Sequence, residues 1–250
     1  MAPILGFLIA IAIGVTGVGG GVLTAPILII FLGVPPLEAV TVSLLFAAAV
    51  KLLIAPAYLW RGQVDFRILG KLLIGGLPGV LLGSWALQRL SAARQSGVVS
   101  AVLGLTIVGA AAVNLYRMWR GSAKAVGQRD GAHWLPFLAF PIGAEVGFSS
   151  AGAGALGTLA LLSLTSLTAA QVVATDVCFG LVLSLIGGGF HWGFSHVTSP
   201  ILWPLIAGGL VGGVAGVYLS GIVPSRPLRA ALCLWLMVIG VQLCWKGMGL

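Results

Sequence analysis

Charged residues are scarce in this chain of 250 residues, of which only 7% are Asp, Glu, Lys or Arg and 59% are hydrophobic. Ordinary soluble domains carry roughly 25% charged residues, so this chain has too few to cover a surface that faces water. Long polar stretches are also missing, since the longest runs only from Arg117 to Gly131. No separate soluble domain fits there, which argues against an enzyme and places the function within a membrane.

Cysteine is rare as well. Cys178, Cys233 and Cys244 all lie in apolar stretches and lack the paired spacing of metal ligands, so we expect no metal and no cofactor. No Lys or Arg precedes the first apolar run, so we expect mature structure there and not a cleaved signal peptide. The net charge of +8 comes from residues that flank apolar segments, which favours membrane orientation over nucleic acid as a partner.

The sequence does contain eight predominantly apolar runs, each close to or above the roughly 20 residues that a helix needs to cross a bilayer. The runs cover residues 4–32, 37–60, 68–87, 97–116, 132–165, 169–190, 200–222 and 228–245. Only short connections separate them. We therefore predict an all-α polytopic membrane protein.

The sequence also repeats itself at an offset of 133 residues. Seven glycines coincide with glycines at this offset, among them Gly14 with Gly147 and Gly79 with Gly212. Such self-similarity at a fixed offset indicates a duplication. We predict two homologous repeats of four segments each, 1–116 and 132–250, joined by a connecting loop at 117–131 within one membrane domain.

The first run of each half is longer than one crossing requires and is interrupted by glycines, at 14–21 and at 147–154. Clustered glycines break a helix, and broken backbone at membrane depth persists only where it faces protein or a water-filled cavity. Paired breaks of this kind point to a transporter binding site. The regularly spaced glycines at 75–83 and 208–216 are interpreted as close helix packing instead.

The basic residues favour one of two topologies. If each glycine-broken run enters the membrane and returns on the same side, nine basic residues share one side and three face the other. The nine are Arg61, Arg67, Lys71, Arg117, Arg120, Lys124, Arg129, Arg226 and Arg229; the three are Arg89, Arg94 and Lys246. Because Lys and Arg gather on the cytoplasmic side, this bias favours inverted repeats with six full spans and two re-entrant hairpins over eight spans.

A helix that begins at a glycine break presents unpaired backbone N–H groups and the positive end of its dipole, which suits an anion. Hydroxyl groups add hydrogen-bond donors without a fixed countercharge. The predicted substrate-binding residues are Thr16, Gly17, Gly19, Gly20, Gly21, Thr24, Ser43, Ser149, Ser150, Gly152, Gly154, Thr175 and Asp176. Glycines that only allow close packing are the alternative interpretation of the breaks.

Charged side chains within the apolar runs are functional candidates, because they are costly in a membrane. Asp176, which the repeat aligns with Ser43, either accepts a proton during transport or serves as a structural hydrogen-bonding group. Lys51 either attracts the anion or extends to an interface. Glu145 either couples transport to an ion or pairs with a helix end. His191 and His196 are expected in an interfacial loop after the sixth run, with no metal.

Together these patterns resemble the sulfite exporter TauE/SafE family, also called the toluene-sulfonate uptake permease group. The resemblance covers nearly the whole chain. It rests on GVGGGVLTAPIL at 17–28, GVPPLEAVTVSL at 33–44, YLWRGQVDFR at 58–67, GGLPGVLLG at 75–83, AGAG at 151–154 and ATD at 174–176. It implies a multi-pass carrier of the bacterial inner membrane for sulfite, sulfoacetate or related organosulfonates. Thr41-Val42-Ser43, where the family often has Ala-Thr-Ser, leaves the substrate open.

We expect alternating access around an anion held between the two breaks, and no enzymatic activity. Export runs with an inside-negative potential, whereas the alternative, uptake, needs a coupling ion such as a proton. The expected partners are a small anionic substrate and the lipid bilayer, and a homo-oligomer is left open. The rivals are an intramembrane serine hydrolase with Ser149 as nucleophile and His191 or His196 as base, a channel and a scaffolding subunit.

Overall fold

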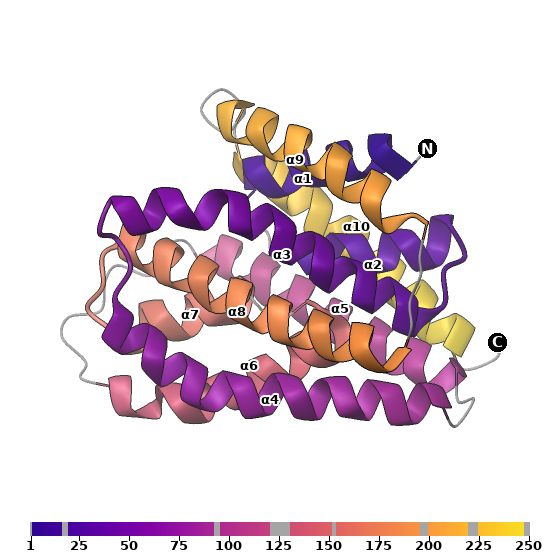
Figure 1. Ribbon diagram of the computed structural model, residues 1–250, viewed down its shortest axis with the longest axis horizontal. Helices are drawn as coiled ribbons and strands as arrows, with labels where there is room; N and C mark the ends of the chain where they lie inside the picture. Colours follow the sequence, from indigo (N-terminus) through magenta and orange to yellow (C-terminus); the bar gives the residue numbers. More distant parts are fainter. Residues whose placement is uncertain are drawn as a thin grey trace.

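The computed structural model describes residues 2–16, 20–92, 96–120, 131–151, 154–195, 200–219 and 225–247, and all regular structure in these ranges is helical (Figure 1). The elements are α1 (Ala2–Thr16), α2 (Gly20–Phe31), α3 (Pro36–Trp60), α4 (Phe66–Ala92), α5 (Ser96–Arg120), the short 3-10 helix η1 (Ala132–Trp134), α6 (Leu135–Ser149), α7 (Ala155–Leu164), α8 (Ala169–Ser195), α9 (Leu202–Leu219) and α10 (Ser225–Gly247).

Every predicted apolar run forms helix, and the first run of each half is divided into two helices at its glycines. Within the described ranges, three helices are long and apolar enough to cross a membrane, namely α3, α4 and α8. Shorter apolar stretches lie in α1, α2, α5, α9 and α10. The predicted all-α membrane fold is confirmed at this level.

Local sequence accounts for the way the long spans begin. Gly33, whose φ of 64° suits glycine, precedes the Pro35-Pro36 pair, and Pro36 opens α3 because a first-turn residue needs no amide donor. At the other end of α3, Gly62 turns the chain with a φ of 61°. The carboxylate of Asp65 then accepts a hydrogen bond from the amide of Ile68 at 2.9 Å, which caps the start of α4.

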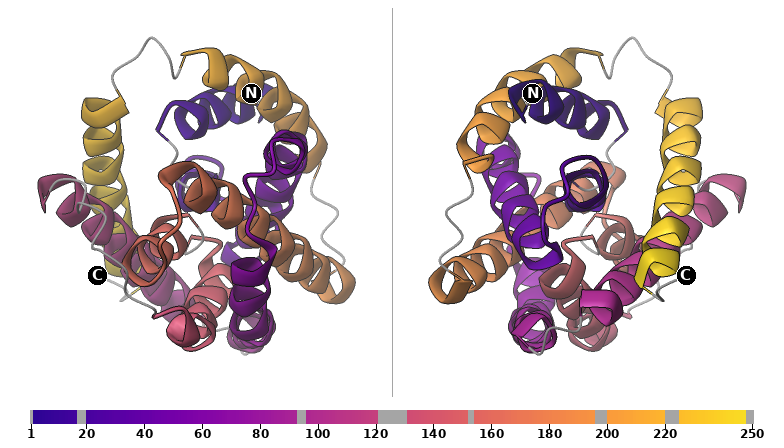
Figure 2. Two further views of the ribbon diagram at one scale, coloured as in Figure 1. Left: turned by 90° about the vertical axis from the view of Figure 1, so that its left-hand side faces the viewer. Right: turned by 90° about the vertical axis from the view of Figure 1, so that its right-hand side faces the viewer.

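Helices of the two halves pack against each other in pairs. α1 lies along α9, α4 along α6, α5 along α10, and α3 against α8 (Figures 1 and 2). Glycines make the first two contacts close. A Cβ on Gly79 of α4 would overlap the carbonyl oxygen of Phe140 on α6, and a Cβ on Gly212 of α9 would overlap that of Phe7 on α1. The interpretation of these regularly spaced glycines as packing residues is confirmed.

These contacts follow the same offset as the sequence repeat. Gly75 approaches the carbonyl of Pro136, and the residues 133 positions away, Gly208 and Pro3, approach each other in the same way. The aromatic ring of Phe179 packs on Gly76. In the corresponding contact, the ring of Phe46 packs on Gly209.

The pair α6 and α7 folds back on itself. A Cβ on Gly131, just before η1, would lie 2.8 Å from the side chain of Leu164, the last residue of α7. The two outer ends of the predicted run 132–165 therefore meet. α6 has 15 residues and is about 22 Å long, shorter than the roughly 30 Å of a bilayer core.

Candidate functional site

The two helix breaks leave part of the predicted site outside the described residues. Gly17, Gly19 and Gly152 fall there, and Thr16 and Gly20 are described by their backbone alone, at the end of α1 and the start of α2. Gly154 precedes α7 with a φ of 105°, a conformation that favours glycine.

The breaks meet at Gly21 and Ser150. The Ser150 hydroxyl donates a hydrogen bond of 3.0 Å to the carbonyl oxygen of Gly21, although 129 residues separate them. A Cβ on Gly21 would overlap the Ser150 carbonyl oxygen, so only glycine allows this approach. Ser150 itself has a φ of 62° and ends α6 in the left-handed region, which is unusual for a residue other than glycine.

Ser149 and Ser150 are both buried. The Ser149 hydroxyl donates to the carbonyl oxygen of Glu145 at 3.0 Å and accepts a hydrogen bond of 3.2 Å from the amide of Ala151. Ser149 therefore satisfies backbone groups at the end of α6, where the helix ladder stops.

The predicted hydroxyl residues of the long spans are buried and already bonded. The Ser43 hydroxyl donates to the carbonyl of Ala39 in its own helix at 2.6 Å. Thr175 uses its oxygen to accept the amide of Asp65 at 3.2 Å, which ties the α3–α4 connection to the start of α8. Thr24 is fully buried within α2, one turn beyond its start.

Asp176 lies beside the first turn of α7. Its carboxylate accepts a hydrogen bond of 3.1 Å from the Thr158 hydroxyl, and a Cβ on Gly157 would overlap its other oxygen. Lys51 lies on α3 and is partly buried. A positive helix end and a hydroxyl donor both favour a carboxylate at the position of Asp176.

Two residues near the second break, His191 and Ser84, are not among the predicted substrate-binding residues. His191 Nε2 lies 3.1 Å from the carbonyl oxygen of Gly147, and the Ser84 hydroxyl donates to the same oxygen at 3.4 Å. The expectation of His191 in an interfacial loop is wrong, because this residue lies within α8 and is fully buried. The predicted apolar run ends at residue 190, whereas α8 continues to Ser195. His196 lies outside the described residues.

The arrangement of Ser149 and His191 does not resemble a nucleophile with its base. The Ser149 hydroxyl donates to a backbone carbonyl, and the Nε2 of His191 is on a different one. In the described part of the chain, no group of three His, Cys, Asp or Glu side chains is placed to bind a metal.

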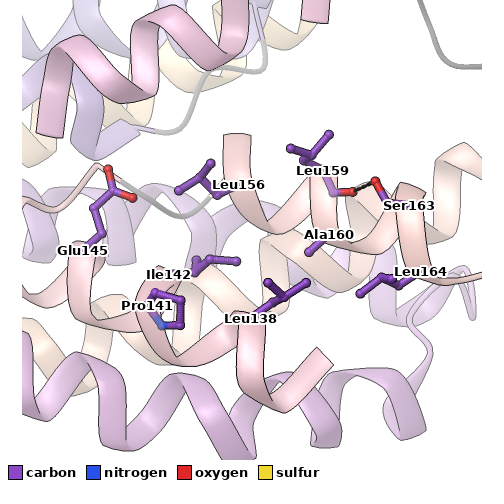
Figure 3. A pocket seen from close by; sticks show the side chains of 9 residues that line it. All are labelled: Leu138, Pro141, Ile142, Glu145, Leu156, Leu159, Ala160, Ser163 and Leu164. Atoms are coloured by element: carbon purple, nitrogen blue, oxygen red, sulfur yellow. Dashed lines mark hydrogen bonds between the residues drawn. The ribbon is translucent and has the colours of Figure 1, made fainter. Parts of the chain in front are cut away.

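A cavity of about 360 Å³ lies between α6 and α7, next to the second break (Figure 3). We call it the hairpin slot. Its lining residues are Leu138, Pro141, Ile142 and Glu145 of α6 and Leu156, Leu159, Ala160, Ser163 and Leu164 of α7. Figure 3 shows Glu145 at one end, near Leu156, and Leu164 at the opposite end.

Comparison with known proteins agrees with this architecture. The family model described as sulfite exporter TauE/SafE matches residues 2–243. A probable membrane transporter protein of Bacillus subtilis, YjnA, is 27% identical over 96% of this chain and 97% of its own length. A probable membrane transporter protein of Xylella fastidiosa is 33% identical over 46% of this chain and 42% of its own. No solved structure matches the chain significantly.

Proposed function

Because the chain belongs to the sulfite exporter TauE/SafE family of membrane transporters, we propose that it carries small sulfur-containing anions. The proposed location is the bacterial inner membrane, which the chain crosses several times. Sulfite, sulfoacetate and related organosulfonates are the proposed substrates. The observation that carries this proposal is the contact between Gly21 and Ser150, which brings two interrupted helices to one place within the bundle. Interrupted helices in both halves are typical of carrier binding sites.

The proposed architecture is a pair of inverted repeats, each opening with a re-entrant hairpin. The packing contacts that recur at an offset of 133 residues support the repeats. The meeting of Gly131 with Leu164 supports re-entry of the second hairpin. In such an arrangement, the two hairpins enter from opposite sides, so movement of one half against the other alternates access to the centre.

The anion is proposed to bind mainly at the start of α2. An anion beside the first turn of α7 would be repelled by the carboxylate of Asp176, which already lies there. At the equivalent place in the first half stands Ser43, a neutral residue. Backbone amides at the start of α2 and the hydroxyl of Thr16 would hold the oxyanion, with Ser149 and Ser150 across the contact.

Export is the proposed direction under a membrane potential alone. Moving one negative charge out of an inside-negative cell releases about 2.3 kcal/mol of free energy per 100 mV. Proton-coupled uptake is the second candidate, and one observation favours it: the carboxyl group of Glu145 stands alone in the hairpin slot.

The test is anion efflux from liposomes that contain the purified protein. Vesicles loaded with sulfite or sulfoacetate are given an inside-negative potential with a potassium ionophore, and efflux should exceed that of protein-free vesicles and slow when the potential is collapsed. Ser150→Ala should weaken transport, while Gly70→Ala, at a glycine with nothing within 4 Å, should not. Efflux equal to protein-free vesicles for both anions would exclude these substrates, and currents far above carrier rates would indicate a channel.

A further inference from the structure

The hairpin slot has the chemistry of a site for a proton and not for an anion. Apart from Glu145, its lining is apolar except for Ser163, whose hydroxyl already donates to the carbonyl of Leu159 at 2.7 Å. Among the described residues that line the slot there is no Lys, Arg or His, so they offer an oxyanion no countercharge. Of these residues, Glu145 alone has a charged side chain.

Within the described chain, Glu145 has no hydrogen-bond or ion-pair partner for its carboxyl group, and few titratable residues lie on the helices packed around α6. α2 and α7 contain no titratable residue, and in α5 the titratable residues are confined to 116–120, in its last two turns. On α4, Arg67 and Lys71 lie in the first two turns and the guanidinium of Arg89 stacks over Trp85, 5.3 Å from the ring centre.

The remaining titratable neighbours lie on α8 and η1. On α8, Asp176 accepts from Thr158, His191 contacts the carbonyl of Gly147, and Cys178 is a buried thiol. His133 of η1 stands twelve positions before Glu145, about 18 Å away along the helix.

The position of Glu145 along α6 also disfavours a negative charge on its carboxyl group. Glu145 lies four residues before the end of the helix at Ser149, near the negative end of the helix dipole. A carboxylate that is removed from water without a partner is costly, and it avoids that cost by taking up a proton. Asp176 has the opposite surroundings, since it lies beside the first turn of α7 and accepts a hydrogen bond from the Thr158 hydroxyl.

We infer that Glu145 is the proton-binding residue of this carrier, in a slot separate from the anion site, and that Asp176 keeps its charge. The inference rests on the proposed function. A proton carried on Glu145 adds one positive charge to the loaded carrier, so less negative charge crosses with the anion. Uptake against an inside-negative potential becomes feasible, driven by the proton gradient.

Chemical labelling tests the site without any transport measurement. Dicyclohexylcarbodiimide is an apolar reagent that adds to a protonated carboxyl group: the carboxyl proton moves to a carbodiimide nitrogen, the oxygen bonds to the central carbon, and the acyl group migrates to nitrogen as a stable N-acylurea. The full-length protein in liposomes should gain one reagent mass at Glu145, located by peptide mass spectrometry. A water-soluble carbodiimide should label this residue far less. Glu145→Gln should abolish the label and Asp176→Asn should leave it.

A transport arm tests the role of the proton. In liposomes at zero potential, an imposed proton gradient should drive anion accumulation by the wild type and not by Glu145→Gln, whereas anion exchange without a gradient should persist in the variant. Labelling at Asp176 in place of Glu145, or a Glu145→Gln carrier that still responds to the proton gradient, overturns the inference. If neither anion is transported but Glu145 is labelled, the proposal about the substrates is wrong, whereas the assignment of Glu145 as a protonated carboxyl group is confirmed.

Discussion

Replacing Gly21 with alanine inserts a methyl group at the point where the two helix breaks meet. The new Cβ would overlap the Ser150 carbonyl oxygen and would lie 2.6 Å from its carbonyl carbon. Both are backbone atoms at the end of α6, so no side-chain rotation relieves the overlap. The hydrogen bond of 3.0 Å from the Ser150 hydroxyl to Gly21 would be stretched or lost.

The expected change in stability follows from three contributions. Overpacking costs about 1–3 kcal/mol, and the lost hydrogen bond costs about 1 kcal/mol. Alanine regains up to about 1 kcal/mol over glycine in a helix. The net destabilisation is about 1–3 kcal/mol, and the apparent melting temperature of a chain of this size should fall by roughly 2–12 °C.

Thermal unfolding in detergent, followed by the loss of monodisperse protein, measures this change, and anion efflux from liposomes measures its effect on transport. Gly70→Ala in α4 is the matched control, because a Cβ there meets nothing within 4 Å. Its melting temperature should be unchanged or slightly higher. If Gly21→Ala melts within about 1 °C of this control and transports normally, the close contact between the breaks is wrong.

Three further predictions concern the elements around the breaks. Gly79→Ala and Gly212→Ala should each lower stability by about 1–3 kcal/mol, because each new Cβ atom overlaps a backbone carbonyl. Gly109→Ala, where a Cβ meets nothing within 4 Å, is the control, and equal thermal stability of all three variants would contradict the prediction. Ser150→Ala should melt lower than Ser150→Gly, because both lose the same hydroxyl but only glycine relieves the left-handed φ of 62°, a difference of about 1 kcal/mol. His191→Gln should be more stable than His191→Asn by about 1–2 kcal/mol in the same assay, because the longer glutamine side chain can still donate a hydrogen bond to the carbonyl oxygen of Gly147. The reverse order would refute that hydrogen bond.

The apolar helices and their interruptions were predictable from local sequence. Composition alone restricts a chain with 7% charged residues to a membrane, and a glycine cluster breaks a helix whatever surrounds it. The packing role of Gly79 and Gly212 was also predictable, because small residues at helical spacing allow close approach. These features depend on residues that are near one another along the chain.

The surroundings of the acidic residues were not predictable in this way. Both Asp176 and Glu145 are candidates for a proton in the sequence, Asp176 within the sixth apolar run and Glu145 just before the second break. The fold separates them, because α7 brings the Thr158 hydroxyl and a positive helix end to Asp176, whereas Glu145 lines a slot whose other side chains are mostly apolar. Whether a carboxyl group gains a hydrogen-bond donor depends on which face of the neighbouring helix points toward it.

Sequence alone therefore determined that this chain is helical, lies in a membrane and is interrupted at two matching places, because hydrophobicity and glycine content act locally. Tertiary structure decided that the interruptions meet, that His191 is buried on the end of α6, and that one carboxyl group is bonded while another is isolated. These contacts join residues that are often far apart along the chain. Only the packing of whole helices fixes such distances.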